Sequence, residues 1–158
     1  MYENMVDVLI YLYENYMDGE GQPPVSQSDL EEELSQAGFS QTEIAHALRW
    51  LDELAVGVET PQYHAHTAGA IRVYSDSECQ KLDTEARGLL LSLEQNGILD
   101  PVSRELAIDR LLAIEHPLVM IDEVKWVVLL VLMNRPGRED AFTLMEDIVY
   151  HDELVYLH

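Results

Sequence analysis

The sequence of 158 residues predicts a mainly α fold, a helical bundle with a winged-helix-like N-terminal part and a C-terminal helical part. Three observations predict it. Apolar residues recur every three or four positions in several separate segments, which is the helical period. Serine or aspartate stands where most of these segments begin, and glycine or proline follows where most of them end. Residues 71–74 are β-prone instead and are expected to form a short strand.

Three helices are expected in the first part of the chain. Residues 2–16 carry apolar side chains at helical spacing, and glycines and prolines follow them. Ser28 with Glu31, and Ser40 with Glu43, each match a capping box, in which the serine oxygen and the glutamate satisfy free amides of the first turn. These pairs predict a second helix that runs to about residue 37 and a third that runs to about residue 55.

The turn between the second and third helices gives this part its helix-turn-helix character. Gly38 begins a three-residue connection, and the strand at 71–74 would add part of a wing. The third helix would then present four polar residues to a partner. These candidate partner-facing residues are Gln41, Thr42, His46 and Arg49.

Four more helices are expected in residues 75–158. Ser75, Asp100 and Asp122 serve as N-caps of the first three, and the last begins near Glu139. The first is expected to run without a break to about residue 96. Residues 124–133 are apolar nearly all round, which favours a central buried helix, although a buried strand fits the same run. Residues 1–74 and 75–158 are therefore predicted to be two parts of one cooperative unit.

Charge is the clearest long-range pattern in the chain. Thirty acidic residues against nine basic ones give a formal net charge of -21. Acids outnumber bases most strongly in residues 1–70, where Arg49 is the only base, and residues 139–158 contain no base. Such a charge opposes approach to phosphate backbones and anionic membranes, so naked nucleic acid and membranes are not the expected partners. A basic protein is.

Residues with reactive or metal-binding side chains form no convincing site in the sequence. His64 and His66 stand in an expected loop without a third ligand pattern, so they are interpreted as solvated histidines. Cys79 is the only cysteine, which excludes an intramolecular disulfide, and its acidic neighbours oppose a reactive thiolate. Adjacent acids such as Asp52 and Glu53 point in different directions on a helix. No catalytic, cofactor or metal site is predicted.

The expected location is the cytoplasm. The N-terminus has no basic stretch followed by an apolar run, the pattern of a secretory signal. The longest apolar run, residues 126–133, is far shorter than a membrane span.

Several sequence blocks carry a family resemblance. The most specific is KWVVL at residues 125–129 followed by NRPG at 134–137, and EQNGIL at 94–99 and the N-terminal MVDVLIYLYE agree with it. With these blocks the chain resembles the bacterial Smg protein family over nearly its whole length. The resemblance implies a bacterial cytoplasmic protein of uncharacterised function. It brings no catalytic motif that could be transferred to this chain.

Two functional hypotheses follow from the charge pattern and the helix-turn-helix. The first is a non-enzymatic acidic adaptor module that engages a basic partner in DNA or RNA metabolism. The alternative is a winged-helix nucleic-acid-associated regulator, which would need basic residues of the more nearly balanced segment 71–138 to converge on one face. Those residues are Arg72, Lys81, Arg87, Arg104 and Arg110. A cryptic enzyme or ligand binder, the third reading, would need a deep polar pocket.

Overall fold

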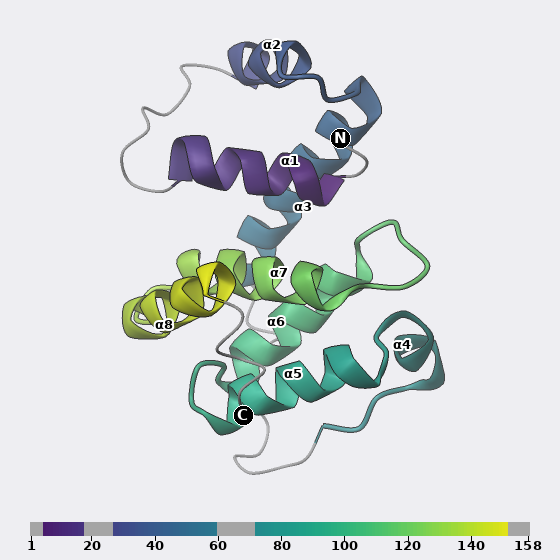
Figure 1. Cartoon of the computed structure of the whole chain (residues 1–158), viewed down its shortest axis with the longest axis vertical. Coiled ribbons are helices and arrows are strands. Elements are labelled where there is room, and N and C mark those ends of the chain that lie inside the picture. Colours follow the sequence, from purple (N-terminus) through teal and green to yellow (C-terminus); the bar gives the residue numbers. More distant parts are fainter. Residues whose placement is uncertain (1–4, 18–26, 60–71, 152–158) are drawn as a thin grey trace. The chain divides into compact units, whose positions relative to one another are not determined.

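A computed structural model of the chain describes residues 5–17, 27–59 and 72–151, and α-helices dominate them (Figure 1). The mainly helical prediction is confirmed. In chain order the elements are α1 (Met5–Leu12), a π-helical turn η1 (Tyr13–Met17), α2 (Gln27–Gln36), α3 (Gln41–Glu59), α4 (Asp76–Lys81), α5 (Thr84–Gln95), α6 (Pro101–Leu112), α7 (Ile121–Met133) and α8 (Glu139–Tyr150).

The chain divides into two compact units, Met1–Glu53 and Leu54–His158. The division falls inside α3, whereas the boundary predicted at residues 74 and 75 falls within the second unit. That the chain unfolds as one cooperative unit stays a prediction.

The first unit is built around the apolar faces of α1 and α3. Valines and leucines of α1 and the side chains of Ile44, Ala47 and Trp50 on α3 are buried. Gly38 has φ 108°, the left-handed conformation that ends α2, and the predicted short turn to α3 is present. Ser40 caps α3 as predicted, because its Oγ accepts a 3.2 Å hydrogen bond from the Glu43 amide. By contrast, α2 begins at Gln27, so Ser28 lies in its first turn and not before it.

The second unit surrounds α7, which packs against α5, α6 and α8. By residue burial α7 is the most continuously buried helix of this unit, and Val127 to Val131 are completely buried. The prediction of a buried helix for residues 124–133 is therefore confirmed, and the alternative of a buried strand is wrong. Burial of each such side chain is worth about 1.5–3 kcal/mol, so this helix holds the unit together. Trp126 adds an edge-to-face contact with Tyr150 of α8, with ring centroids 5.8 Å apart.

The predicted uninterrupted helix of residues 76–96 is wrong. It is broken between α4 and α5 at Leu82, whose backbone is extended (φ -107°, ψ 106°) and forms an isolated parallel bridge with Val119. The next helix, α5, begins directly after Asp83, which is its N-cap because its carboxylate accepts a 2.9 Å hydrogen bond from the Ala86 amide. The capping box of Ser75 and Glu78 at the start of α4 is confirmed.

The strand predicted at residues 71–74 is not formed by Arg72, Val73 and Tyr74, and residue 71 lies outside the described part of the chain. A strand needs a neighbour to accept its ladder of hydrogen bonds. These three residues have no neighbouring strand among the described segments, and Arg72 instead bonds through its side chain to Glu78 and Glu105. A wing, and with it the winged-helix-like N-terminal part, is therefore not supported.

The last two capping predictions have different outcomes. Asp100 caps α6 with Pro101 in the first turn, as predicted, and accepts a 2.7 Å hydrogen bond from the Ser103 amide. In α7 the N-cap is Met120 and not Asp122, and Glu123 supplies the cap by accepting a 2.9 Å hydrogen bond from the Met120 amide. Among the helices of the three described ranges, none is both long enough and apolar enough to cross a membrane.

Candidate functional site

The four predicted partner-facing residues lie on the first half of α3. Gln41, Thr42 and Arg49 are exposed and His46 is half-buried. Thr42, His46 and Arg49 fall on one side of the helix because they are four and three residues apart, whereas Gln41 is turned away from them by about 100°. The structure therefore brings three of the four together, and the half-buried His46 lies one turn before the buried Trp50.

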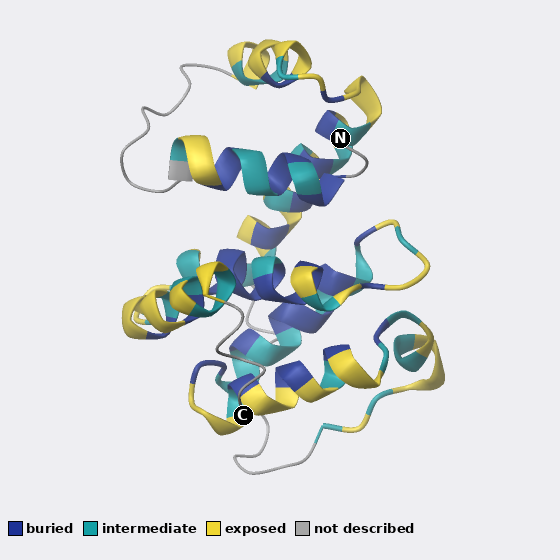
Figure 2. Cartoon of the chain, in the orientation of Figure 1, coloured by how far each residue is buried: buried dark blue, intermediate teal, exposed yellow. Residues whose placement is uncertain are grey.

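Beside α3 in the chain, α2 exposes an acidic surface. Asp29, Glu32 and Glu33 are exposed, and Leu34 is the only buried residue of this helix (Figure 2). Asp52 and Glu53 are exposed on α3, where the sequence alone predicted only solvated acids. This surface of α2 and α3 has no lysine, and Arg49 is its one base. We use the name acidic face for this set of exposed carboxylates, Asp29, Glu32 and Glu33 on α2 and Asp52 and Glu53 on α3.

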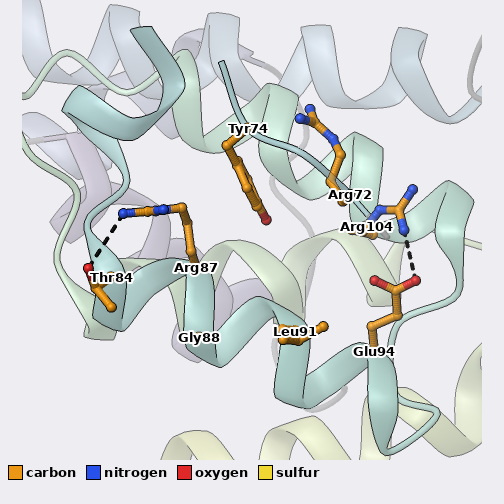
Figure 3. Close-up of a pocket in the computed structure, with 8 residues that line it drawn as sticks. All are labelled: Arg72, Tyr74, Thr84, Arg87, Gly88, Leu91, Glu94 and Arg104. Atoms are coloured by element: carbon orange, nitrogen blue, oxygen red, sulfur yellow. Dashed lines mark hydrogen bonds and ion pairs between the residues drawn. The ribbon is translucent and has the colours of Figure 1, made fainter. Parts of the chain in front are cut away.

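In the second unit, three of the five bases that the nucleic-acid hypothesis requires line one pocket. Arg72, Arg87 and Arg104 reach it from the segment before α4, from α5 and from α6 (Figure 3). Its volume is about 260 Å³. The rest of its lining consists of Tyr74, Thr84, Gly88, Leu91 and Glu94. We call it the arginine pocket.

Two of these arginines are held by carboxylates. Arg72 makes two 2.9 Å hydrogen bonds to Glu78 and a 2.8 Å bond through Nε to Glu105. Arg104 bonds to Glu105 through Nε and to Glu94 through Nη1, both at 2.8 Å. Glu105 therefore joins the two guanidinium groups. The bonds from Arg72 are the main reason that the pKa of Glu78 falls to about 2, so this carboxylate stays ionised.

Arg87 is held differently. Its Nε donates to the backbone oxygens of Leu82, at 3.0 Å, and Asp83, at 3.3 Å, and Nη2 reaches the Thr84 hydroxyl at 3.5 Å. No carboxylate of the described ranges pairs with it. Figure 3 shows the ring of Tyr74 between Arg87 and the other two arginines. The Cζ of Arg72 lies 4.9 Å from the ring centroid and that of Arg87 6.0 Å, which is cation–π distance.

The other two of these five bases lie elsewhere. Lys81 donates to the backbone oxygens of Leu112 and Ile114, and burial lowers its pKa. Arg110 is only 6% exposed and pairs with Asp109. The convergence of all five that a nucleic-acid face would require is therefore not found.

The weaker candidates gain nothing from the structure. His64 and His66 lie outside the described residues, as does the chain after residue 151. Within the part that is described, no three His, Cys, Asp or Glu side chains are grouped so as to hold a metal ion. Cys79 is a half-buried free thiol on α4.

Sequence reasoning missed the arginine pocket as a site, although it singled out its three arginines. One signal was available. Thr84, Arg87, Gly88 and Leu91 share the face of a helix whose other face is the apolar stripe, and a glycine in the middle of a helix is costly without a reason. The partners from distant segments, Tyr74 and Glu105, carry no such signal.

Comparison with known proteins gives one family. The family model described as "Protein of unknown function (DUF494)" matches residues 5–158. A Protein Smg homolog of Alkalilimnicola ehrlichii is 48% identical over 160 residues, with 100% of both chains covered. Those of Thioalkalivibrio sulfidiphilus (43%, 100% of both chains) and Shewanella halifaxensis (44%, 98% of this chain and 99% of the other) are similar too. No solved structure matches the chain.

Proposed function

Because the chain belongs to the DUF494 family of Smg homologues, whose function is unknown, we propose its role from its own surface. It is a non-enzymatic adaptor of the cytoplasm that docks onto a basic protein through the acidic face of its first unit. The observation that carries the proposal is the acidic face itself, five exposed carboxylates with Arg49 as the single base beside them.

The packing of α2 supports this role. A helix that buries only Leu34 contributes little to a core, yet it presents Asp29, Glu32 and Glu33 to the solvent. A concentration of one charge sign raises the local concentration of an oppositely charged partner and speeds its association. The neighbouring Thr42 and Arg49 add a hydrogen-bonding group and a single cation. These two side chains fix the position in which a partner docks on the surface. The partner class is a protein with a lysine- and arginine-rich surface, as proteins that handle DNA or RNA have.

The alternative, a winged-helix regulator that touches nucleic acid, has less support. It needs a wing and five converging bases. The described residues provide no strand at 72–74, and Lys81 and Arg110 are bound to other parts of the second unit. Arg72 and Arg104 are partly neutralised by Glu78, Glu94 and Glu105.

The experiment is affinity capture from the native bacterium with two matched variants. Glu32→Lys changes the charge by two on the acidic face, and Asp147→Lys makes the same change at an exposed position of α8 in the second unit. The wild type and Asp147→Lys are expected to retain the same basic protein at low salt, Glu32→Lys to lose it, and all three to lose it at about 1 M salt, where the Debye length is about 3 Å. Equal capture by both variants, or capture that does not respond to salt, would refute the proposal.

A further inference from the structure

The arginine pocket has features that its own ion pairs do not explain, and they concern the outer face of α5. Thr84, Arg87, Gly88 and Leu91 lie at positions i, i+3, i+4 and i+7 and so form one stripe. The buried leucines of α5 lie on the opposite side. Thr84, Gly88 and Leu91 are exposed, so the described part of the chain leaves the stripe open to another group.

Gly88 is the first of these features. A Cβ built on it would meet nothing within 4 Å, and glycine in the middle of a helix costs roughly 0.5–1 kcal/mol relative to alanine. Neither a close approach nor an unusual backbone angle within the described chain requires glycine at this position. What the missing side chain provides is space, on the floor of a pocket of about 260 Å³.

Leu91 and Tyr74 supply apolar walls to that space. The Leu91 side chain is 51% exposed at the rim. The phenol ring of Tyr74 is half-buried, and burial raises its pKa, so it stays neutral. A flat ring placed over Gly88 would pack against the Tyr74 ring, since aromatic pairs are favourable with centroids about 4.5–7 Å apart. Its other side would meet the apolar side chain of Leu91.

Hydrogen-bond donors complete the pocket. Arg72 uses all three of its nitrogens on Glu78, Glu105 and its own segment. Arg87 Nη1 and Arg104 Nη2, by contrast, have no hydrogen-bond partner in the part of the chain that the structure describes. The guanidinium of Arg87 is nevertheless fixed, because its Nε is bonded to two backbone oxygens. Fixed donors of this kind suit a carboxylate, whose two oxygens accept from guanidinium groups.

The charge of the whole chain decides which acidic ligand fits. A net charge of -21 repels a polyanion such as nucleic acid, whereas one or two carboxylates meet a weaker repulsion that is screened beyond about 8 Å at physiological salt. The volume, about 260 Å³, is just under the range of about 300–1,000 Å³ typical of small-molecule pockets. It suits one large side chain of a protein.

We infer that the arginine pocket binds a segment of a partner protein in which an aromatic side chain stands beside an aspartate or glutamate. The ring lies over Gly88 between Tyr74 and Leu91, and the carboxylate accepts hydrogen bonds from Arg87. This site lies in the second unit and uses none of the residues of the acidic face, so the chain would have two separate docking surfaces.

The experiment selects peptides from a random display library on the full-length protein and titrates the enriched peptides by fluorescence anisotropy. Aromatic residues next to aspartate or glutamate should be enriched, and replacing the acid by its amide should weaken binding about tenfold, or 1.4 kcal/mol. Gly88→Leu fills the pocket and Arg87→Gln removes its unpaired charge, so both should weaken binding by the same order. Arg87→Lys should restore part of the loss.

Two controls separate lost binding from lost folding. Gln95→Leu adds the same side chain as Gly88→Leu at an exposed position of α5 outside the pocket, and its affinity should stay within about twofold of wild type. Gly88→Leu should unfold at the same or a higher temperature than wild type, because leucine is the better helix former. The inference is overturned if no acidic–aromatic sequence is enriched or if Gly88→Leu binds the selected peptides normally. It is overturned too if a single-stranded oligonucleotide displaces them.

Discussion

The Glu78 carboxylate binds the Arg72 guanidinium through two hydrogen bonds of 2.9 Å each, while also accepting a 2.8 Å hydrogen bond from the Ser75 amide. One side chain thus caps α4 and fastens the preceding segment, residues 72–74, to it. The Glu78 side chain is only 15% exposed and that of Arg72 21%, so water screens the pair weakly. The wall of the arginine pocket that carries Tyr74 depends on this pair.

A pH dependence follows from that pair. The folded-state pKa of Glu78 is about 2, below its ordinary 4.5, so its stabilisation is complete above pH 4.5 and is lost as the pH falls toward 2. Glu78→Gln should lower the free energy of unfolding at pH 7 by about 1.5–3 kcal/mol, the usual contribution of hydrogen bonds to charged groups. Urea denaturation measures it, and the gap between wild type and variant should shrink from pH 5 to pH 2. A gap that is constant over this range would contradict the assignment, and Glu85→Gln, at an exposed position, is the control.

Asp83 separates α4 from α5, and its cap can be tested by a pair of substitutions. Asp83→Ala removes the acceptor for the Ala86 amide and should cost about 0.5–2 kcal/mol in urea denaturation. Asp83→Asn keeps a side-chain oxygen at the same position to accept the hydrogen bond, and it should cost only a few tenths of the free energy that Asp83→Ala costs. If the two substitutions destabilise the protein equally, the Asp83 carboxylate does not act as the cap of α5.

These two residues also show what the sequence could and could not predict. The capping box of Ser75 and Glu78 is a local pattern, and the sequence predicted it correctly. The break at Asp83 was missed, because what holds Leu82 extended is its bridge to Val119, which lies far along the chain. The aspartate was visible in the sequence, yet helical spacing continued across it and local signals gave no reason to stop.

The same contrast applies to the candidate sites. The sequence predicted that Gln41, Thr42, His46 and Arg49 all face a partner. The helical period places Thr42, His46 and Arg49 on one side of the helix and turns Gln41 away from them. The arginine pocket combines residues from three segments, and the ion pairs of Arg72 with Glu105 join positions 33 residues apart. The β-branched and aromatic character of residues 71–74 predicted a strand, but these long-range ion pairs and the lack of a neighbouring strand among the described residues override local preference.

The central position of α7 predicts a large stability effect in its core. Leu130 is completely buried, so Leu130→Ala should lower the free energy of unfolding by about 2–5 kcal/mol through lost burial and the cavity left behind. Leu144→Ala on α8 is the matched control, since Leu144 is 55% exposed, and it should change stability by no more than about 0.5 kcal/mol. Urea denaturation of both variants measures the difference. Similar costs for the two would mean that α7 is not the centre of the second unit.

Arg135, in the NRPG block, is predicted to couple the turn after α7 to the start of α6. Its Nη1 donates to both carboxylate oxygens of Asp100, at 2.9 and 3.0 Å, and to the Ser103 hydroxyl at 2.6 Å. Burial raises the pKa of Asp100, but hydrogen bonds from Ser103 and Arg135 outweigh it and the pKa falls. A double-mutant cycle of Asp100→Asn and Arg135→Gln should therefore give a coupling energy of about 0.5–3 kcal/mol in urea denaturation at pH 7.

That coupling should depend on pH in one direction. Because the folded-state pKa of Asp100 is depressed, its contribution is present above the unfolded pKa and disappears as the pH falls through the folded one. The coupling energy from the same cycle measured at acid pH should approach zero. Asp147→Asn paired with Arg135→Gln is the control cycle, because Asp147 contacts His151 and shares no partner with Arg135, and it should be additive within about 0.5 kcal/mol. If the Asp100 cycle is additive as well, the bonds between Arg135 and Asp100 contribute nothing beyond the N-cap that Asp100→Asn leaves in place.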